Sequence, residues 1–433
     1  MPNKPRTPLA ALAIACLLAT GAAHAQDAFH FSGFGTVGAS ITDTDKAEFV
    51  TPGQPGNGAT KEASFAPDTK LGLQASYRFN SVFSATAQVL TKYTGAGDWD
   101  PALEWAFVKA QPAAGWTIRL GRMGAPIFAI SDFREVNFAN TWVRPPLEVY
   151  SQVALSSFDG ADVSYQHSFD SAVVTATVFG GEMKSNFNNA EVTLKNEIGF
   201  NVTAELESGL TLRAGYSQGE LRVAGGRIAS LLAGTNQLAS NSATALIRAG
   251  LPAALSDAAA ALDARKRASF SGVGASWDIN NWLLNAEYTW RRADHYISDS
   301  TGWYASVGRR IGKVTPYIYY AELKVDELKL NNPITATDIN AAAGLLAGLR
   351  APLAGLAGGY AAVAAGQDFG QKTVAVGARW DAFKSVAFKA QLEHIKPQSS
   401  NAVANGLFLP ADSTTNLKGK SVNVFTLSAD FVF

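Results

Sequence analysis

The stretch SVNVFTLSADFVF, residues 421–433, decides how the rest of the chain is interpreted. Its side chains alternate in polarity, which is the period of a β-strand with two dissimilar faces. The strand also ends on an aromatic residue. The apolar face consists of Phe425, Leu427, Ala429, Phe431 and Phe433, and the polar face of Thr426, Ser428 and Asp430.

The first 25 residues predict a secretory signal peptide. Lys4 and Arg6 precede the apolar run LAALAIACLL at 9–18, and small residues at 23 and 25 flank a cleavage point before Gln26. The apolar run is about half of the ~20 residues that a membrane-spanning helix requires. We therefore expect the mature chain to begin near Gln26 and to form one domain, residues 26–433.

Composition excludes several classes of protein. The only cysteine, Cys16, lies in the expected signal peptide, so the mature chain has no disulfide or cysteine-ligated zinc. Without Lys4 and Arg6 the chain carries 34 basic and 36 acidic residues, a net charge of −2 (34 − 36). No basic excess indicates a nucleic-acid partner. Charged residues make up only 17% of the sequence, which suits a protein with a lipid-facing belt.

The alternating pattern recurs along the chain and predicts sixteen strands. Each even strand from the second to the fourteenth is followed by a turn of a few residues, whereas most odd strands are followed by long loops. An even number of antiparallel strands with short turns at one end and long loops at the other is typical of bacterial outer-membrane barrels. The predicted strands are 29–41, 70–79, 82–93, 102–111, 115–122, 158–168, 171–180, 196–206, 210–220, 269–278, 282–292, 301–310, 314–324, 371–381, 385–396 and 420–433. The long loops are 42–69, 123–157, 181–195, 221–268, 325–370 and 397–419.

The two faces of these strands favour a water-filled barrel. Apolar residues share one side of 282–292, while Asn285, Glu287 and Arg291 share the other. A charge placed in lipid at mid-depth costs roughly 2–4 kcal/mol, so the polar side faces the lumen. A barrel of about sixteen strands leaves an aqueous channel. The sequence therefore predicts an all-β transmembrane barrel that forms a pore.

The terminal strand ending on Phe433, the strand FSGFGTVG at 31–38 and the sixteen-strand order resemble those of the Gram-negative porin superfamily. The resemblance implies an outer-membrane, multi-pass barrel that is exported through a cleaved signal peptide. It also implies a homotrimer. In general porins the loop after the fifth strand folds into the barrel and narrows it, which here is the segment Gly121–Ser157.

We expect 123–152 to form the pore constriction. Pro126, Pro145 and Pro146 restrict its backbone, and its large apolar residues give it a side that packs on the wall. Charges at the narrowest point of a pore select ions. The expected charges of the constriction loop are Asp132, Arg134, Glu135, Arg144 and Glu148, and those of the pore wall are Arg78, Lys92, Arg119 and Glu104.

Two Ala- and Leu-rich segments, 227–267 and 337–366, predict helices within long loops. One helix is expected from Ser256-Asp257 to Arg265, and another from Thr337-Asp338 to Arg350, each with acid at its start and base at its end. These helices either shield the mouth of the barrel or fold partly into the lumen.

No catalytic group, metal site or cofactor site is expected. His30, His167, His295 and His394 are scattered over distant strands, outside any nucleophile signature. Gly33, Gly35 and Gly38 have the spacing of the dinucleotide-binding motif GxGxxG. The sequence predicts no helix after them, which this motif requires, so we expect no dinucleotide site here.

The leading hypothesis is therefore a passive diffusion channel for small hydrophilic solutes and ions, with outer-membrane lipid around it and no cofactor. One alternative is a substrate-specific channel with a binding site formed by the loop helices, Trp142, Arg144 and Tyr150. A second alternative is a closed structural or adhesive barrel.

Overall fold

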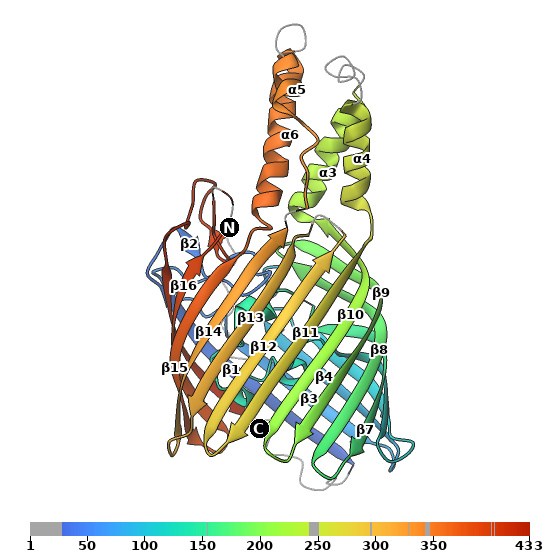
Figure 1. Cartoon of the computed structure of the whole chain (residues 1–433), viewed down its shortest axis with the longest axis vertical. Helices are drawn as coiled ribbons and strands as arrows, with labels where there is room; N and C mark the ends of the chain where they lie inside the picture. Colours follow the sequence, from blue (N-terminus) through green and yellow to red (C-terminus); the bar gives the residue numbers. More distant parts are fainter. Residues whose placement is uncertain are drawn as a thin grey trace.

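The computed structural model describes residues 28–153, 155–241, 251–294, 297–327, 329–342, 347–399, 401 and 403–433. Within these ranges, sixteen antiparallel strands form a closed barrel (Figure 1). A small sheet in the loops pairs β2 (Ala47–Glu48) with β17 (Leu409–Pro410). The expected signal peptide, residues 1–25, lies outside the described residues. The barrel strands are β1 (Phe29–Thr42), β3 (Lys70–Arg78), β4 (Phe83–Lys92), β5 (Ala102–Ala110), β6 (Trp116–Gly124), β7 (Ser157–Ser168), β8 (Ala172–Phe187), β9 (Ala190–Leu206), β10 (Leu210–Gly225), β11 (Lys266–Ile279), β12 (Trp282–Ala293), β13 (Asp299–Arg309), β14 (Val314–Glu327), β15 (Gln371–Phe383), β16 (Val386–Pro397) and β18 (Val422–Val432).

The barrel closes between β1 and β18, which pair in register from Phe34 opposite Val432 to Thr42 opposite Val424. Beyond these pairs, the Gly33 N–H donates to the Phe433 carbonyl at 2.9 Å and the Phe433 N–H donates back at 3.0 Å. The Phe433 ring lies so close to Gly33 that a Cβ there would be 2.3 Å from it. The glycines of 33–38 therefore serve strand packing at the closure.

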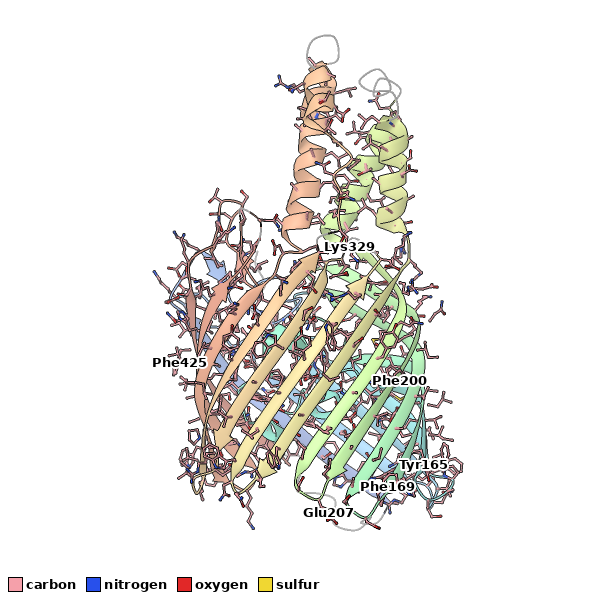
Figure 2. The ribbon with its side chains drawn as sticks, in the orientation of Figure 1. Tyr165, Phe169, Phe200, Glu207, Lys329 and Phe425 are labelled. Carbon is pink, nitrogen blue, oxygen red and sulfur yellow. The ribbon has the colours of Figure 1, made fainter. Side chains whose placement is uncertain are left out.

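The strand faces divide as the sequence predicts. Phe425 and Leu427 are 42% and 51% exposed on the outside of β18, whereas Thr426 and Asp430 on its inner face are fully buried. Phe200 and Phe425 lie on the outer wall at mid-height, and Tyr165 and Phe169 lie near the end of the barrel with the short turns (Figure 2). The outward apolar face and the inward polar face are those of a barrel in a bilayer.

All sixteen predicted strands are present, but one predicted loop is wrong. Residues 181–195 are not a long loop, because β8 continues to Phe187 and β9 begins at Ala190. Asn188 and Asn189 form the turn with positive φ angles of 49° and 60°. Asparagine tolerates this conformation better than most residues. The pattern was misleading because the register shifts between Gly181 and Met183, so the apolar residues Met183 and Leu194 beyond this point face the buried inner side instead of the outer side.

Four helices project from the end of the barrel that carries the long loops (Figure 1). α3 (Gly226–Ala239) and α4 (Leu251–Asp263) lie between β10 and β11, and α5 (Ala336–Ala341) and α6 (Ala347–Ala365) lie between β14 and β15. They share their own apolar core, distinct from that of the barrel, which includes Leu231, Leu255, Leu353, Leu356 and Tyr360. None of the helices in the described ranges has the length and apolar character needed to cross a membrane.

The predicted helix boundaries require correction. Ser256 and Asp257 lie inside α4 rather than at its start. α5 begins earlier than predicted, because Thr335 is its N-cap and forms a capping box with Asp338. α6 runs beyond Arg350 and contains Pro352 near its start. The helices project beyond the long-loop end of the barrel and do not enter the lumen (Figure 1).

Candidate pore constriction

The segment between β6 and β7, residues 125–156, lies inside the barrel (Figure 1). It contains two short 3-10 turns, Ser131–Phe133 and Asn137–Ala139, and the single-turn helix α2 (Leu147–Tyr150). We call it the inner loop. Its apolar residues, among them Phe128 and Trp142, pack against the inner faces of the wall strands. The Nζ of Lys389 on β16 donates to the carbonyls of Asn137 and Trp142, both at 2.7 Å.

Arg144 anchors the inner loop to both ends of the chain. Its guanidinium donates to Asp68 in the loop after β1 at 2.7 and 2.8 Å, and also to Glu393 on β16. Its Nη2 further donates to Ser40 on β1 and Thr426 on β18 at 3.0 and 2.7 Å. Burial alone would raise the pKa of Asp68, but the charge and hydrogen bonds of Arg144 hold that pKa below its ordinary value.

Glu148 forms a second, different anchor on α2. It is 1% exposed, and it accepts hydrogen bonds from Thr373 and, at 2.7 Å, from Gln371, both on β15. No basic group pairs with it within the described residues. Burial therefore raises the pKa of the Glu148 carboxyl above its ordinary value, although the hydrogen bonds to Thr373 and Gln371 oppose the shift.

Of the three residues predicted for a solute-binding site, only Trp142 borders the cavity between the inner loop and the wall. Trp142, Arg144 and Tyr150 are only 2%, 4% and 3% exposed. The Trp142 indole donates to Ser306 at 2.9 Å, and the Tyr150 hydroxyl donates to Glu287 at 2.7 Å, so both polar groups are hydrogen-bonded to the wall. Arg144 and Tyr150 fill the space between the loop and the barrel and are not placed to contact a solute, whereas a role of Trp142 stays a prediction.

Glu135 is held by two lysines of the neighbouring strands. Its carboxylate accepts from Lys70 on β3 at 2.9 Å and from Lys92 on β4 at 2.7 Å, while the Arg134 guanidinium lies 3.9 Å away. Burial opposes ionisation, yet these three cations hold the pKa of Glu135 well below its ordinary value. Glu135 therefore fixes this part of the inner loop to the β3–β4 wall.

A cavity of about 1060 Å³ remains between the inner loop and the opposite wall. Asp132 of the loop lines it, together with Arg119 on β6 and Arg213 on β10. Arg119 is paired with Asp162, and Arg213 donates to the Pro126 carbonyl at 2.5 Å. Within the described ranges Asp132 makes no ion pair, and its charge acts on both arginines across the cavity.

The family is decided by a sequence comparison. A family model of Gram-negative porins matches residues 9–328, which is most of the chain. The chain is a Gram-negative porin. It is therefore a channel-forming barrel of the outer membrane. No curated protein sequence matches this porin.

Solved structures share the fold of this porin. OmpT folded in vitro, an outer-membrane protein of Vibrio cholerae, superposes with a TM-score of 0.51 at 12% identity over 94% of this porin and 97% of that chain. A mutant of OmpT that lacks loop L8 gives a TM-score of 0.50 at 12% identity, covering 94% and 100% of the two chains. At this identity the likeness shows the barrel fold alone.

The four charges predicted for the pore wall do not lie at one level of the barrel. Lys92 and Arg119 face the inner loop and the cavity, as described above. Arg78 is exposed at the end of β3 next to a short turn, away from the loop. Glu104 is 9% exposed and is the extra residue of a β-bulge, since pairing jumps from Gln88–Trp105 to Val89–Leu103. Alternation alone could not predict this bulge.

Two residues that sequence reasoning missed, Lys70 and Asp68, hold the inner loop. Lys70 shares the inward phase of Gln74 and Arg78, so the alternation of β3 contained a signal for it. Asp68 lies in the loop before β3, where no periodicity indicates its direction.

Proposed function

We propose that this porin is a passive diffusion channel for small hydrophilic solutes and ions, with its narrowest zone between the inner loop and the β6–β10 wall. The observation that carries the proposal is the loop itself, which crosses the interior and is tied to the wall by Arg144, Glu135 and Lys389. Passage through such a channel requires no chemical step. We accordingly propose neither catalytic residues nor a cofactor.

The charges of this zone support weak selection between ions. Asp132 lies on the loop side, and Arg119 and Arg213 lie on the wall side of the same cavity. A solute passing between them meets a field directed across its path, which favours polar solutes over apolar ones. Arg144 and Glu148 contribute by fixing the loop and do not contact the solute, because both are buried against the wall.

Single-channel recording in planar bilayers tests the proposal. Asp132→Lys should shift the reversal potential in a salt gradient towards anion preference, and Asp132→Asn should shift it less. Asp132 is the informative position because it is exposed and makes no ion pair within the described residues. Reversing Glu135 would instead break two ion pairs and displace the loop.

Deleting 129–141 should raise the single-channel conductance, because it removes the part of the inner loop that lines the cavity. Folded variants that conduct and select as the wild type does would refute the constriction. A wild-type barrel without conductance would refute the channel.

Two further parts of the proposal concern the mature protein. We propose that residues 1–25 are removed on export, so that N-terminal sequencing of the outer-membrane form should begin near Gln26. We also propose a homotrimer. Mass measurement by light scattering after mild detergent extraction should give three chains, and a stable monomer would contradict this part alone.

A further inference from the structure

Among the neighbouring barrel strands of the described ranges, only β1 and β18 are not joined by a turn or a loop. They come from opposite ends of the chain, and the entropy cost of bringing two ends together grows with the length between them. Side-chain hydrogen bonds support this pairing, which we call the seam, from inside. Thr36 donates to Asp430 at 2.8 Å, and the hydroxyl oxygens of Ser40 and Thr426 lie 2.7 Å apart.

The inner loop covers the inner face of the seam. Thr36, Ser40, Thr426 and Asp430 are at most 1% exposed, although they face the interior of the barrel. The second 3-10 turn of the inner loop, Asn137–Ala139, contacts both β1 and β18. Hydrogen bonds are stronger where water is excluded, and polar groups are costly there unless they have partners. The seam is therefore shielded from water only while the inner loop is docked.

Arg144 of the inner loop bridges the seam directly. Its Nη2 donates to Ser40 on β1 at 3.0 Å and to Thr426 on β18 at 2.7 Å. Ser40 and Thr426 are directly opposite each other in the register of the two strands. One nitrogen atom is thus hydrogen-bonded to the first and the last strand of the barrel at once. Neither strand can move away from the other without losing a charge-assisted hydrogen bond.

A second link lies further along the seam. Lys389 on β16 forms an ion pair with Asp430 at 2.8 Å, and both side chains are fully buried. The same Nζ donates to the inner-loop carbonyls of Asn137 and Trp142. Asp430 in turn accepts from Thr36 across the seam. The inner loop, β16, β18 and β1 are therefore connected by one continuous set of polar contacts.

We propose that the inner loop has a second function besides narrowing the pore: residues 137–144 are an internal clamp that holds the seam closed. Docking of the clamp and pairing of β1 with β18 form one cooperative unit. An undocked loop leaves Asp68 and Glu393 without their common cation, Arg144, and an open seam separates the two hydroxyls that Arg144 holds. This function concerns assembly and does not depend on which solutes pass through the pore.

Amide hydrogen exchange of the full-length barrel in detergent, resolved by peptide with mass spectrometry, tests the clamp. Thr426→Val removes an acceptor of Arg144 at the seam. Exchange should accelerate by at least about tenfold in β1, in β18 and in 137–144, because a buried hydrogen bond to a charged group is lost. Thr177→Val is the matched control, since Thr177 makes an inward hydrogen bond of 2.9 Å to Ser164 between β7 and β8, which a short turn joins. It should leave the seam and the inner loop at their wild-type rates.

The reverse direction is tested with Arg144→Lys, which keeps the charge but not the guanidinium, and with Arg144→Met. Both variants should accelerate exchange in β1 and β18 while β8 and β9 keep their wild-type rates, and Arg144→Met should have the larger effect. Acceleration confined to 125–156 would overturn the proposal, because the seam would then hold the loop without being held by it. An effect of Thr177→Val on the seam equal to that of Thr426→Val would overturn it as well.

Refolding from urea into detergent, followed by pulse labelling, tests whether the two events form one unit. Residues 137–144 and β18 should gain protection at the same rate. Protection of β18 in a phase that clearly precedes or follows protection of 137–144 would show that the seam closes without the clamp.

Discussion

Arg144 contacts four separate parts of the chain: the loop after β1, and strands β1, β16 and β18. Its two acidic partners, Asp68 and Glu393, are themselves 2% and 3% exposed in their side chains. Removing one member of a buried charge group leaves the others unpaired in a poorly solvated place. This makes Arg144 the most sensitive charged position of the inner loop.

Arg144→Met should destabilise the loop arrangement by about 3–5 kcal/mol. We expect a lower unfolding temperature, measured by loss of heat-modifiable gel mobility, together with noisier single-channel current. Arg122→Met is the control, because the Arg122–Asp159 pair is exposed on the outer face and should be worth about 0–1 kcal/mol. Equal unfolding temperatures for the two variants would show that Arg144 does not anchor the loop.

Glu148 predicts a pH dependence of stability. Its pKa is raised in the folded state, so its contribution to folding is fully present below its ordinary pKa of 4.5 and is lost as the pH rises through the folded value. Glu148→Gln keeps an oxygen that accepts from Thr373 and Gln371 but cannot ionise. The variant should match wild type at pH 4 and unfold at a higher temperature at pH 8, as followed by circular dichroism. Glu182→Gln, which changes an exposed ion pair, should leave the wild-type pH profile unchanged. If the unfolding temperatures of wild type and Glu148→Gln change with pH in parallel, the pKa of Glu148 is not raised in the folded protein.

The sequence could predict the direction of individual side chains but not their partners. Alternation places Glu393, Asp162 and Lys389 on the inward phase, and the structure confirms that they are buried inside. Arg144 and Glu393 are 249 residues apart, and neither periodicity nor spacing brings them together. For the same reason the division of the inner-loop charges into anchors (Arg144, Glu148, Glu135) and a lumen residue (Asp132) required the three-dimensional packing.

Among the elements, the strands were the most predictable and the loop segments the least. A lipid belt enforces alternation over each crossing, so strand positions follow from polarity alone. Above the belt this constraint ends, and both the β8–β9 hairpin and the helix boundaries departed from the prediction. α3–α6 have an apolar core of their own, because their apolar residues pack mainly on one another, with Val223 of β10 at the base of the cluster.

The helical unit should be separable from the channel. Replacing residues 227–264 and 331–366 with short turns should leave heat-modifiable folding and single-channel conductance unchanged, because α3–α6 stand away from the lumen. Replacing 331–366 alone should cause aggregation in detergent, since Leu231 of α3, which lies against α6, would lose its cover. A change in conductance in the double replacement would show that the helices control the pore.

For the whole molecule, every barrel strand is hydrogen-bonded on both sides and the sheet has no free edge. A chain truncated after Gly419 lacks β18, and one edge of β1 and one edge of β16 would then have no partner strand. It should be degraded or aggregate, and its gel mobility should not differ between heated and unheated samples. A truncated chain that still shows heat-modifiable mobility would mean that β1 and β16 can close the barrel by themselves.

The pairing of β1 with β18 also determines when the barrel can close during biogenesis. β1 leaves the ribosome first and β18 last, with almost the whole barrel sequence between them. No cylinder can form while the polypeptide is still being exported, so the nascent porin must cross the periplasm with its strands unsealed. Until that closure the unpaired strand edges and apolar faces of the chain are open to contact with other chains. Late closure also removes incomplete chains, because a chain that lacks β18 cannot close the barrel and stays accessible to proteases.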